Sequence, residues 1–354
     1  MTQEIKFINN ADTSLNKDFN RYEPIMGNDY IVIDWMMGNT CNYSCSYCHP
    51  TIYGGSIPWP EVDTGMKFVK RATDHYRSIG KNKIVWNLLG GEPTVWKDFS
   101  KFFTAVKEYD PDCIVRILTN GSRTLGWWER NKHLFDELII SFHPEKADYK
   151  HCTEVANILA DAGVVVSVQV CMYPPMAEYC VEAMKYFHEH SRAYSVVSKS
   201  LQETLIDDRT MLYDDDFLKE MRQYDGEPKS LNPELRNSDD FVHALNQTKQ
   251  GRPAFGKMMR FVNTHTGITD FTQANDAMSS GRNSWKGWMC NIGIEGLKIY
   301  ENGNVTSGSA CFGKLLHGTI NDPDNIEFPS TGRVCEYEWC SCVADVEITK
   351  YRIE

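Results

Sequence analysis

The region between residues 30 and 200 alternates apolar stretches with segments of helical periodicity, and this alternation constrains the fold more than any other feature. The stretches have the length and β-branched content of buried strands, while the segments between them carry apolar residues at helical spacing. Repeated βα units with right-handed crossovers form a parallel sheet that curls into a barrel or opens into a doubly wound sheet. The predicted strands are 30–37, 83–89, 113–120, 137–142, 164–172 and 193–200, and the predicted helices are 61–79, 97–109, 124–135, 147–162 and 175–190.

Two motifs follow the first two predicted strands, at the edge of a parallel sheet where functional residues gather. Cys41, Cys45 and Cys48 share one loop after the first strand, and the sequence GGEP (90–93) follows the second. Three thiolates on one loop can occupy three corners of an iron–sulfur cube and leave one iron open, as a reactive metal site requires. A zinc site is the alternative, with His49 as the nominal fourth ligand, although a residue adjacent to Cys48 cannot easily face the same metal.

Together the two motifs resemble those of the radical S-adenosylmethionine (SAM) superfamily, and the resemblance covers residues 30–200. It implies an α/β fold with a partial (β/α)6 TIM-like barrel and a four-iron four-sulfur (4Fe-4S) cluster. It also implies that S-adenosylmethionine binds the open iron and that one electron splits it into methionine and a 5′-deoxyadenosyl radical, which abstracts hydrogen from a substrate. The implied cluster ligands are Cys41, Cys45 and Cys48, and the residues implied to bind the cofactor are Tyr47, Gly90, Gly91, Glu92, Pro93 and Ser141.

The predicted strand 164–172 has one apolar face, made mostly of valines, and a second face that carries Ser167, Gln169 and Cys171. Because helices pack outside a barrel, the valines are expected to face outward and the other three residues to face the lumen. By the same alternation Ser141 faces inward on the strand 137–142. A thiol gives up its hydrogen atom readily, so Cys171 is a candidate catalytic hydrogen donor and would make the enzyme an epimerase; a packing role is the alternative.

Five further cysteines lie between residue 290 and the end of the chain, around a hairpin signal at Asn302-Gly303. This arrangement resembles the auxiliary-cluster extension that follows many radical SAM barrels, known as SPASM or, in its shorter form, twitch. The resemblance implies a small cysteine-rich C-terminal domain with one auxiliary 4Fe-4S cluster and one cysteine to spare, whereas a structural zinc site would also suit four thiolates. The candidate ligands are Cys290, Cys311, Cys335, Cys340 and Cys342, with the spare one among the last three.

The same features divide the chain into four parts. Residues 1–29 form an N-terminal extension, 30–204 the radical SAM barrel, 205–285 an insertion or bridging region with short helices, and 286–354 the iron–sulfur domain. The first part is shorter than the peptide-recognition domain that peptide-modifying members of the superfamily often carry. Substrate recognition is therefore expected from 205–285, from the C-terminal domain or from a partner.

Composition and charge limit the binding partners, the compartment and the use of the cysteines that can be expected. The chain has 354 residues and a net charge of −11, which argues against a protein that grips nucleic-acid phosphates. It has no apolar run long enough to span a membrane and a polar N-terminus without a secretion signal, so a cytoplasmic protein is expected. In that compartment its 12 cysteines serve metal binding or packing rather than disulfides.

These arguments favour a radical SAM oxidoreductase that modifies a peptide or a small polar molecule, by oxidation or bond formation through the auxiliary cluster. Flavodoxin or ferredoxin is the expected electron donor, and epimerisation is the second choice for the reaction. A non-enzymatic iron–sulfur electron carrier and a zinc-stabilised interaction module are the alternatives from other classes. The GGEP motif (90–93) argues against the carrier, which has no need of a site for an amino-acid ligand.

Overall fold

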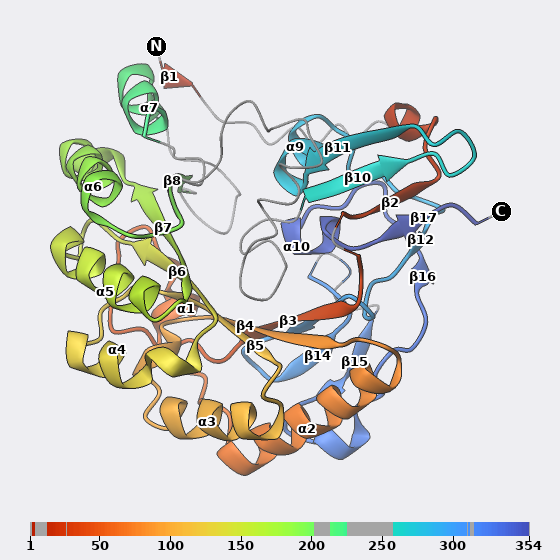
Figure 1. The fold of residues 1–354 in the computed structure, drawn as a ribbon, viewed down its shortest axis with the longest axis horizontal. Helices are drawn as coiled ribbons and strands as arrows, with labels where there is room; N and C mark the ends of the chain where they lie inside the picture. The colour runs from red at the N-terminus through yellow and green to blue at the C-terminus, as the bar shows by residue number, and fades with distance from the viewer. Residues whose placement is uncertain are drawn as a thin grey trace.

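A computed structural model describes residues 2–3, 13–25, 27–201, 213–224, 258–309, 311 and 315–353. Its centre is a run of parallel strands in chain order, as the sequence predicts (Figure 1). Neighbouring strands pair in register, so that Asp34 lies beside Asn87 and Gln169 beside Ser141. The partial TIM-like barrel is thereby confirmed. Its strands are β3 (Tyr30–Met36), β4 (Lys83–Leu89), β5 (Ile114–Thr119), β6 (Glu137–Phe142), β7 (Val165–Met172) and β8 (Ser195–Ser200).

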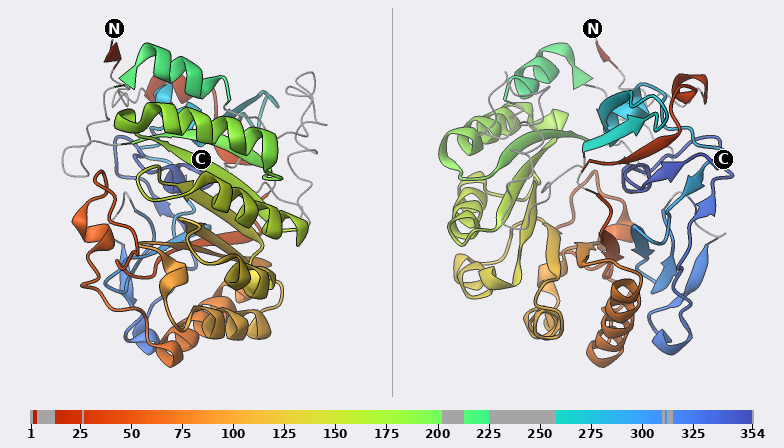
Figure 2. Two further views of the ribbon diagram at one scale, coloured as in Figure 1. Left: turned by 90° about the vertical axis from the view of Figure 1, so that its left-hand side faces the viewer. Right: turned by 45° about the vertical axis from the view of Figure 1, so that its right-hand side comes forward.

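Helices cover the outer face of these strands (Figures 1 and 2). Large aromatic side chains fill the layer between them: Trp35 of β3 meets Phe102 of α3 with ring centroids 5.9 Å apart. Burial of such rings supplies much of the driving force for folding. Two of the helix starts have side-chain caps, since Thr124 and Asp148 accept hydrogen bonds from backbone N–H groups of the following turn. The helices are α2 (Val62–Ser78), α3 (Phe99–Tyr109), α4 (Leu125–Asn131), α5 (Tyr149–Asp161) and α6 (Ala177–His190).

Strand β7 has the two faces that its sequence predicts. Its valines at positions 166, 168 and 170 are fully buried in the core beneath the helices. Gln169 and Cys171 face cavities inside the barrel, and the Ser167 hydroxyl lies 2.8 Å from that of Ser195 on β8. The barrel lumen is therefore polar in part, in contrast to its apolar outer face.

The C-terminal region extends the barrel sheet on the other side. Strand β13 (Gly296–Ile299) pairs in parallel with β3, and β14 (Asn304–Thr306) and β15 (Leu316–Thr319) follow as antiparallel strands. The predicted hairpin is confirmed, with Gly303 at a φ of 87° in the tight turn between β13 and β14. Residues far apart in sequence thus share one nine-stranded sheet.

A second sheet pairs a strand near the start of the chain with strands from its C-terminal part. Tyr22, Phe261 and Trp285 pack beneath it as an aromatic core. Its strands, in spatial order, are β11 (Thr269–Gln273), β10 (Met258–Val262), β2 (Arg21–Pro24), β17 (Lys350–Tyr351), β12 (Met289–Cys290) and β16 (Arg333–Val334). The described part of 205–285 contains short helices, α7 (Asp215–Arg222) and α9 (Ala274–Ser279), as expected, but also the hairpin β10–β11, which the sequence did not reveal.

Three smaller elements complete the described fold. Strand β1 (Thr2–Gln3) pairs with β9 (Tyr213–Asp214), and helix α10 (Val343–Val346) lies beside the second sheet. A second helix expected in the bridging region, at 239–248, lies outside the described residues. In the described part of the chain, every helix is too short or too polar to cross a membrane.

Candidate active site

A cavity of about 590 Å³ opens at the carboxyl ends of the barrel strands. Inward-facing strand-end residues form its floor, including Met36, Leu89 and Leu118. The loop after β3 and the turn after β4 form part of its wall, so the two sequence motifs meet here. Of the residues singled out from the sequence, those that line this cavity are Cys41, Cys45, Tyr47, Cys48, His49, Gly90, Gly91, Ser141 and Cys171.

The cysteine loop is fixed to the barrel by contacts with the segments after β6 and β7. Glu145 accepts hydrogen bonds from the backbone N–H of Ser46 at 2.7 Å and from its hydroxyl at 2.6 Å. The Tyr47 hydroxyl lies 3.0 Å from Nδ1 of His143, and the two rings are nearly parallel with centroids 5.8 Å apart. The Tyr173 hydroxyl adds a contact of 2.9 Å to Ser46. The loop that carries the thiols is therefore held in place by protein contacts.

The glycine pair packs directly against the cysteine loop. The backbone of Gly91 has a φ of 47°, and a Cβ atom there would lie 2.2 Å from the carbonyl oxygen of Thr40. The next N–H group, that of Glu92, donates a 2.8 Å hydrogen bond to the same oxygen. Only glycine permits this close approach, because any side chain would push the two loops apart. The motif thus sets the distance between the backbone at 90–91 and the cysteines.

Glu92 and Pro93 lie behind the cavity wall rather than in it, which differs from the expectation that both contact the cofactor. The Glu92 side chain is 1% exposed. It accepts hydrogen bonds from the backbone and hydroxyl of Thr94, from the hydroxyl of Thr119 at 2.8 Å and from the Asn120 N–H at 2.6 Å. Burial raises the pKa of this carboxyl, while the four donors oppose that shift. The hydrogen bonds of the Glu92 carboxylate therefore tie the turn after β4 to the end of β5.

The three thiols lie among groups suited to a metal cluster. The Tyr43 N–H donates to Sγ of Cys41 at 3.3 Å, and the Asn120 amide lies 3.8 Å from the same sulfur. Burial raises the pKa of Cys41 to about 11. A hydrogen bond between Cys45 and Cys48 raises the pKa of the first and lowers that of the second. The sulfurs of Cys45 and Cys48 and a ring nitrogen of His143 lie within 4.8 Å of one another, close enough to bind the same metal ion.

His49, the nominal zinc ligand, has a different role. Its Nδ1 accepts from the Thr51 N–H at 3.3 Å and lies 2.8 Å from the Thr51 hydroxyl. The side chain therefore caps helix α1 (Pro50–Tyr53) at the cavity rim. His143, rather than His49, is the histidine beside Cys45 and Cys48.

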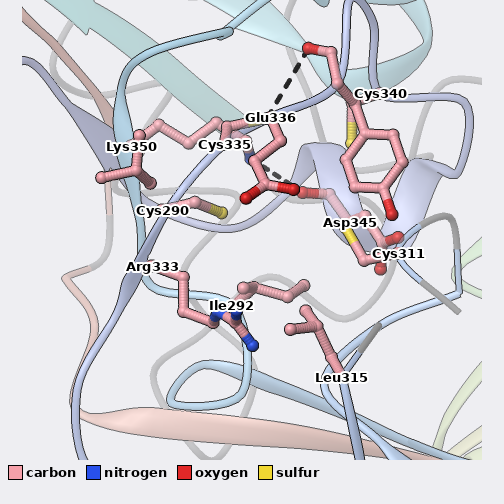
Figure 3. Close-up of a pocket in the computed structure, with 12 residues that line it drawn as sticks. Cys290, Ile292, Cys311, Leu315, Arg333, Cys335, Glu336, Cys340, Asp345 and Lys350 are labelled. Carbon is pink, nitrogen blue, oxygen red and sulfur yellow. Dashed lines mark hydrogen bonds between the residues drawn. The ribbon is translucent and has the colours of Figure 1, made fainter. Parts of the chain in front are cut away.

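The C-terminal cysteines form a second, smaller site (Figure 3). Four of them line a cavity of about 50 Å³, together with Ile292, Leu315 and Tyr337. This volume is several times the ~10–15 Å³ that one water needs, so the space between the thiols is larger than a single water site. The four cysteines are Cys290, Cys311, Cys335 and Cys340. Cys342 precedes α10 and is absent from the lining, which favours it as the spare cysteine.

A buried cation lies beside this second site. Lys350 is 1% exposed, and its ammonium donates to the carbonyl oxygens of Asp345 at 2.7 Å and Ile348 at 2.8 Å. Burial raises the pKa of Cys290 to about 11 and that of Cys311 to about 12, and the positive charge of Lys350 opposes both shifts. A metal would replace the thiol protons and place negative sulfur next to this ammonium.

Several cavity residues were not singled out from the sequence. Lys199 of β8 and Lys298 of β13 line the barrel cavity, as do Tyr43 and Asn120. Asn120 also makes a turn directly after β5, since its Oδ1 accepts from the Ser122 N–H at 3.0 Å. The signal for the lysines was present, because each is a charged residue within a short β-rich stretch, but only the pairing of β13 with β3 brings Lys298 to the barrel.

Comparison with known proteins adds a family to this geometry. Residues 35–190 match the family model of the Radical SAM superfamily. Among solved structures, anSMEcpe with bound AdoMet and Cp18Cys peptide is similar at 14% identity over 83% of this chain and 78% of that one, with a TM-score of 0.46. SuiB from Streptococcus suis matches at 14% identity, 80% and 61% coverage and a TM-score of 0.45. BtrN in an open conformation matches at 12% identity, 83% and 76% coverage and a TM-score of 0.36.

At these TM-scores the structural likenesses carry no weight, and the chain spans less than two thirds of the SuiB chain. The assignment depends instead on the family model, whose matched range starts in β3 and ends with α6. That range contains the cysteine loop, the glycine pair and most of the barrel cavity. Residues 35–190, which form most of the barrel, therefore match the Radical SAM superfamily.

Proposed function

We propose that this protein uses its barrel site for reductive cleavage of S-adenosylmethionine and for hydrogen abstraction from a peptide or a small polar substrate. One observation carries the proposal: Cys41, Cys45 and Cys48 share a single large cavity with the backbone of Gly90 and Gly91. The two segments come from different loops and meet only because the barrel strands bring them to the same edge. A protein that merely stored an iron–sulfur cluster would need no such adjoining space.

The chain's own residues have distinct tasks in this proposal. Cys41, Cys45 and Cys48 would hold a 4Fe-4S cluster, which supplies the electron that splits S-adenosylmethionine when both are bound. The N–H of Tyr43 and the amide of Asn120 donate toward the Cys41 sulfur and would stabilise its thiolate form. The backbone at 90–91 and the Ser141 hydroxyl line the cavity and would position the polar ends of the cofactor.

The C-terminal region would hold an auxiliary 4Fe-4S cluster of the SPASM or twitch type. Four cysteine side chains around one cavity support four ligands, and Cys342 is the residue left over. An auxiliary cluster can accept the electron that a substrate radical must lose, so the favoured outcome is oxidation or bond formation. Flavodoxin or ferredoxin would supply the first electron. A four-thiolate zinc site is the alternative at this position.

Epimerisation is the second candidate reaction, because Cys171 faces the barrel cavity. Its side chain is 2% exposed, and burial raises the pKa of the thiol to about 11. The sulfur therefore keeps its hydrogen at neutral pH, as a hydrogen-atom donor must. A packing role for Cys171 fits the same burial.

The proposal is tested on anaerobically reconstituted protein by two measurements. About eight irons per chain are expected for two four-iron clusters. Incubation with S-adenosylmethionine and dithionite is expected to release 5′-deoxyadenosine. Four irons with one zinc would reassign the C-terminal site to zinc, and iron without 5′-deoxyadenosine would support an electron carrier instead.

A further inference from the structure

The barrel cavity has a wall of unusual charge. Its described lining includes Lys199 and Lys298 but no aspartate or glutamate. The whole chain carries 48 acidic and 37 basic residues, so composition alone would give the cavity more acids than bases. The excess of positive charge is a local property of this site.

Carboxylates near the cavity are engaged elsewhere. Glu92 accepts from four donors behind the wall, and Glu145 accepts from the backbone and hydroxyl of Ser46. Asp34 lies beside Lys298 in the pairing of β3 with β13, but its Oδ1 accepts from the Asn87 amide at 2.6 Å. These carboxylates are therefore held by other donors, and none of them lines the barrel cavity.

Neither lysine has a carboxylate partner in the described part of the chain, within the 4.0 Å that defines an ion pair. Lys199 is exposed and pairs in register with Cys171. Lys298 is half-buried, and it also lines a deeper cavity of about 300 Å³ whose wall includes Asp34, Asp345 and Glu347. Lys298 thus stands between this deeper cavity, whose described lining has more acidic than basic residues, and the barrel cavity, whose described lining has no acidic residue.

The two lysines approach from opposite margins of the barrel. The run of parallel strands begins with β13 and ends with β8, and each of these strands carries one lysine. Both side chains nevertheless line the same cavity. An anionic group that enters this cavity meets positive charge on two sides, and the carboxylates of the deeper cavity repel it.

We propose that Lys199 and Lys298 bind an anionic oxygen group of the substrate, such as a carboxylate; this rests on the proposed function, because it assigns a substrate class to the same site. A half-buried ammonium without a counterion gains most from a charge-assisted hydrogen bond. The carboxylate of S-adenosylmethionine has the same chemistry, so the experiment must separate the two sources.

The test measures binding to the reconstituted holoprotein, by fluorescence anisotropy with labelled peptides that contain three glutamates, three glutamines or three lysines. S-adenosylhomocysteine, which has the cofactor's carboxylate but is not cleaved, is measured separately by calorimetry. The variants are Lys199→Met, Lys298→Met and the charge-retaining Lys298→Arg. Lys101→Met is the matched control, because Lys101 is exposed on α3 outside the barrel and its loss changes the net charge equally.

The glutamate peptide is expected to bind about tenfold more tightly than the glutamine peptide, as one charge-assisted contact would provide. Lys298→Met should remove most of that preference and Lys199→Met part of it, while Lys298→Arg and Lys101→Met keep it. Affinity for S-adenosylhomocysteine should stay within about twofold in all variants. Equal binding of the two peptides to the unmodified protein would overturn the proposal, and so would a loss confined to S-adenosylhomocysteine. Absence of 5′-deoxyadenosine would instead count against the proposed function, since the peptide measurement does not depend on cleavage.

Discussion

The two cysteine sites of this protein are built in opposite ways. The barrel site has three thiols on a loop that hydrogen bonds and ring contacts fix to the ends of β6 and β7, beside a cavity of about 590 Å³. The C-terminal site has four thiols around about 50 Å³. The barrel site rests on a large core. Among the described residues, the hydrophobic cluster around Cys290 is small and comprises Cys290, Ile292, Leu315 and Ile348, with Cys311 packed against it, while Cys340 packs against the aromatic core of the second sheet.

This contrast predicts that the fold around the two sites depends on metal to different degrees. A preformed loop with adjoining space can lose its metal and keep its fold, because packing beneath the loop does not depend on the ligand. A small region with a thin core obtains much of its folding energy from metal ligation. Loss of metal is therefore expected to abolish activity at the first site and to weaken structure at the second.

The largest expected effect is on activity at the barrel site. Replacing Cys41, Cys45 and Cys48 together with Ala should reduce release of 5′-deoxyadenosine to the level of buffer, because no ligand for the reactive cluster remains. The iron at the C-terminal site should stay, measured by iron content after reconstitution. Cys113→Ala is the matched control, since Cys113 is buried in the barrel core away from both cavities. Release of 5′-deoxyadenosine by the triple variant would refute the assignment of these ligands.

The next effect is on metal content and stability at the C-terminal site. A double variant, Cys290→Ala with Cys311→Ala, should lose about half of the iron of two four-iron clusters and unfold at a lower temperature. Cys342→Ala provides the comparison, because its side chain lies outside the cavity, and should keep both iron and melting temperature. Full iron content in the double variant would show that these cysteines are not ligands. A loss equal to that of the double variant in Cys342→Ala would move the spare position to another cysteine.

The local pattern of apolar, polar and glycine residues was enough to predict the barrel from the sequence. Strand β4 has the predicted bounds 83–89, and the alternation in β7 correctly placed Cys171 and Gln169 inside. Both are consequences of short-range chemistry, since a buried parallel strand must be apolar on its outer face and glycines must occupy turns with positive φ. The cysteine loop and glycine turn were found for the same reason.

Long-range pairing could not be predicted in this way. The second sheet joins Arg21–Pro24 to Met258–Val262 and to Lys350–Tyr351, and strands of two to five residues carry too weak a periodic signal. The same limit hid Lys298, which reaches the barrel only through the pairing of β13 with β3. Glu92 shows a different limit: its motif was recognised, but only the structure reveals that its carboxylate faces the protein interior.

A smaller effect is expected at Glu92, whose buried carboxylate ties the turn after β4 to the end of β5. In Glu92→Gln the amide NH2 would meet donors where an oxygen now accepts, so a buried donor would lose its partner. The expected cost is about 1–3 kcal/mol in the free energy of unfolding, measured by chemical denaturation. Glu145→Gln is the matched control, since this side chain also holds the cysteine loop but is more exposed, and a smaller loss is expected. Equal stability of Glu92→Gln and the unmodified protein would mean that the fold does not depend on this network.

The smallest expected effect is at Cys171, where the two candidate reactions differ. If the auxiliary cluster removes the electron, the thiol only fills the barrel, and Cys171→Ser should change turnover by less than about twofold, because serine has nearly the same shape. Turnover in deuterated water should then leave no deuterium at the reacting carbon. An epimerase would behave differently, because the hydroxyl of serine holds its hydrogen too strongly to donate it to a carbon radical. One solvent deuterium in the product, together with loss of turnover in Cys171→Ser, would therefore make Cys171 the hydrogen donor and limit the C-terminal site to a structural role or to electron supply.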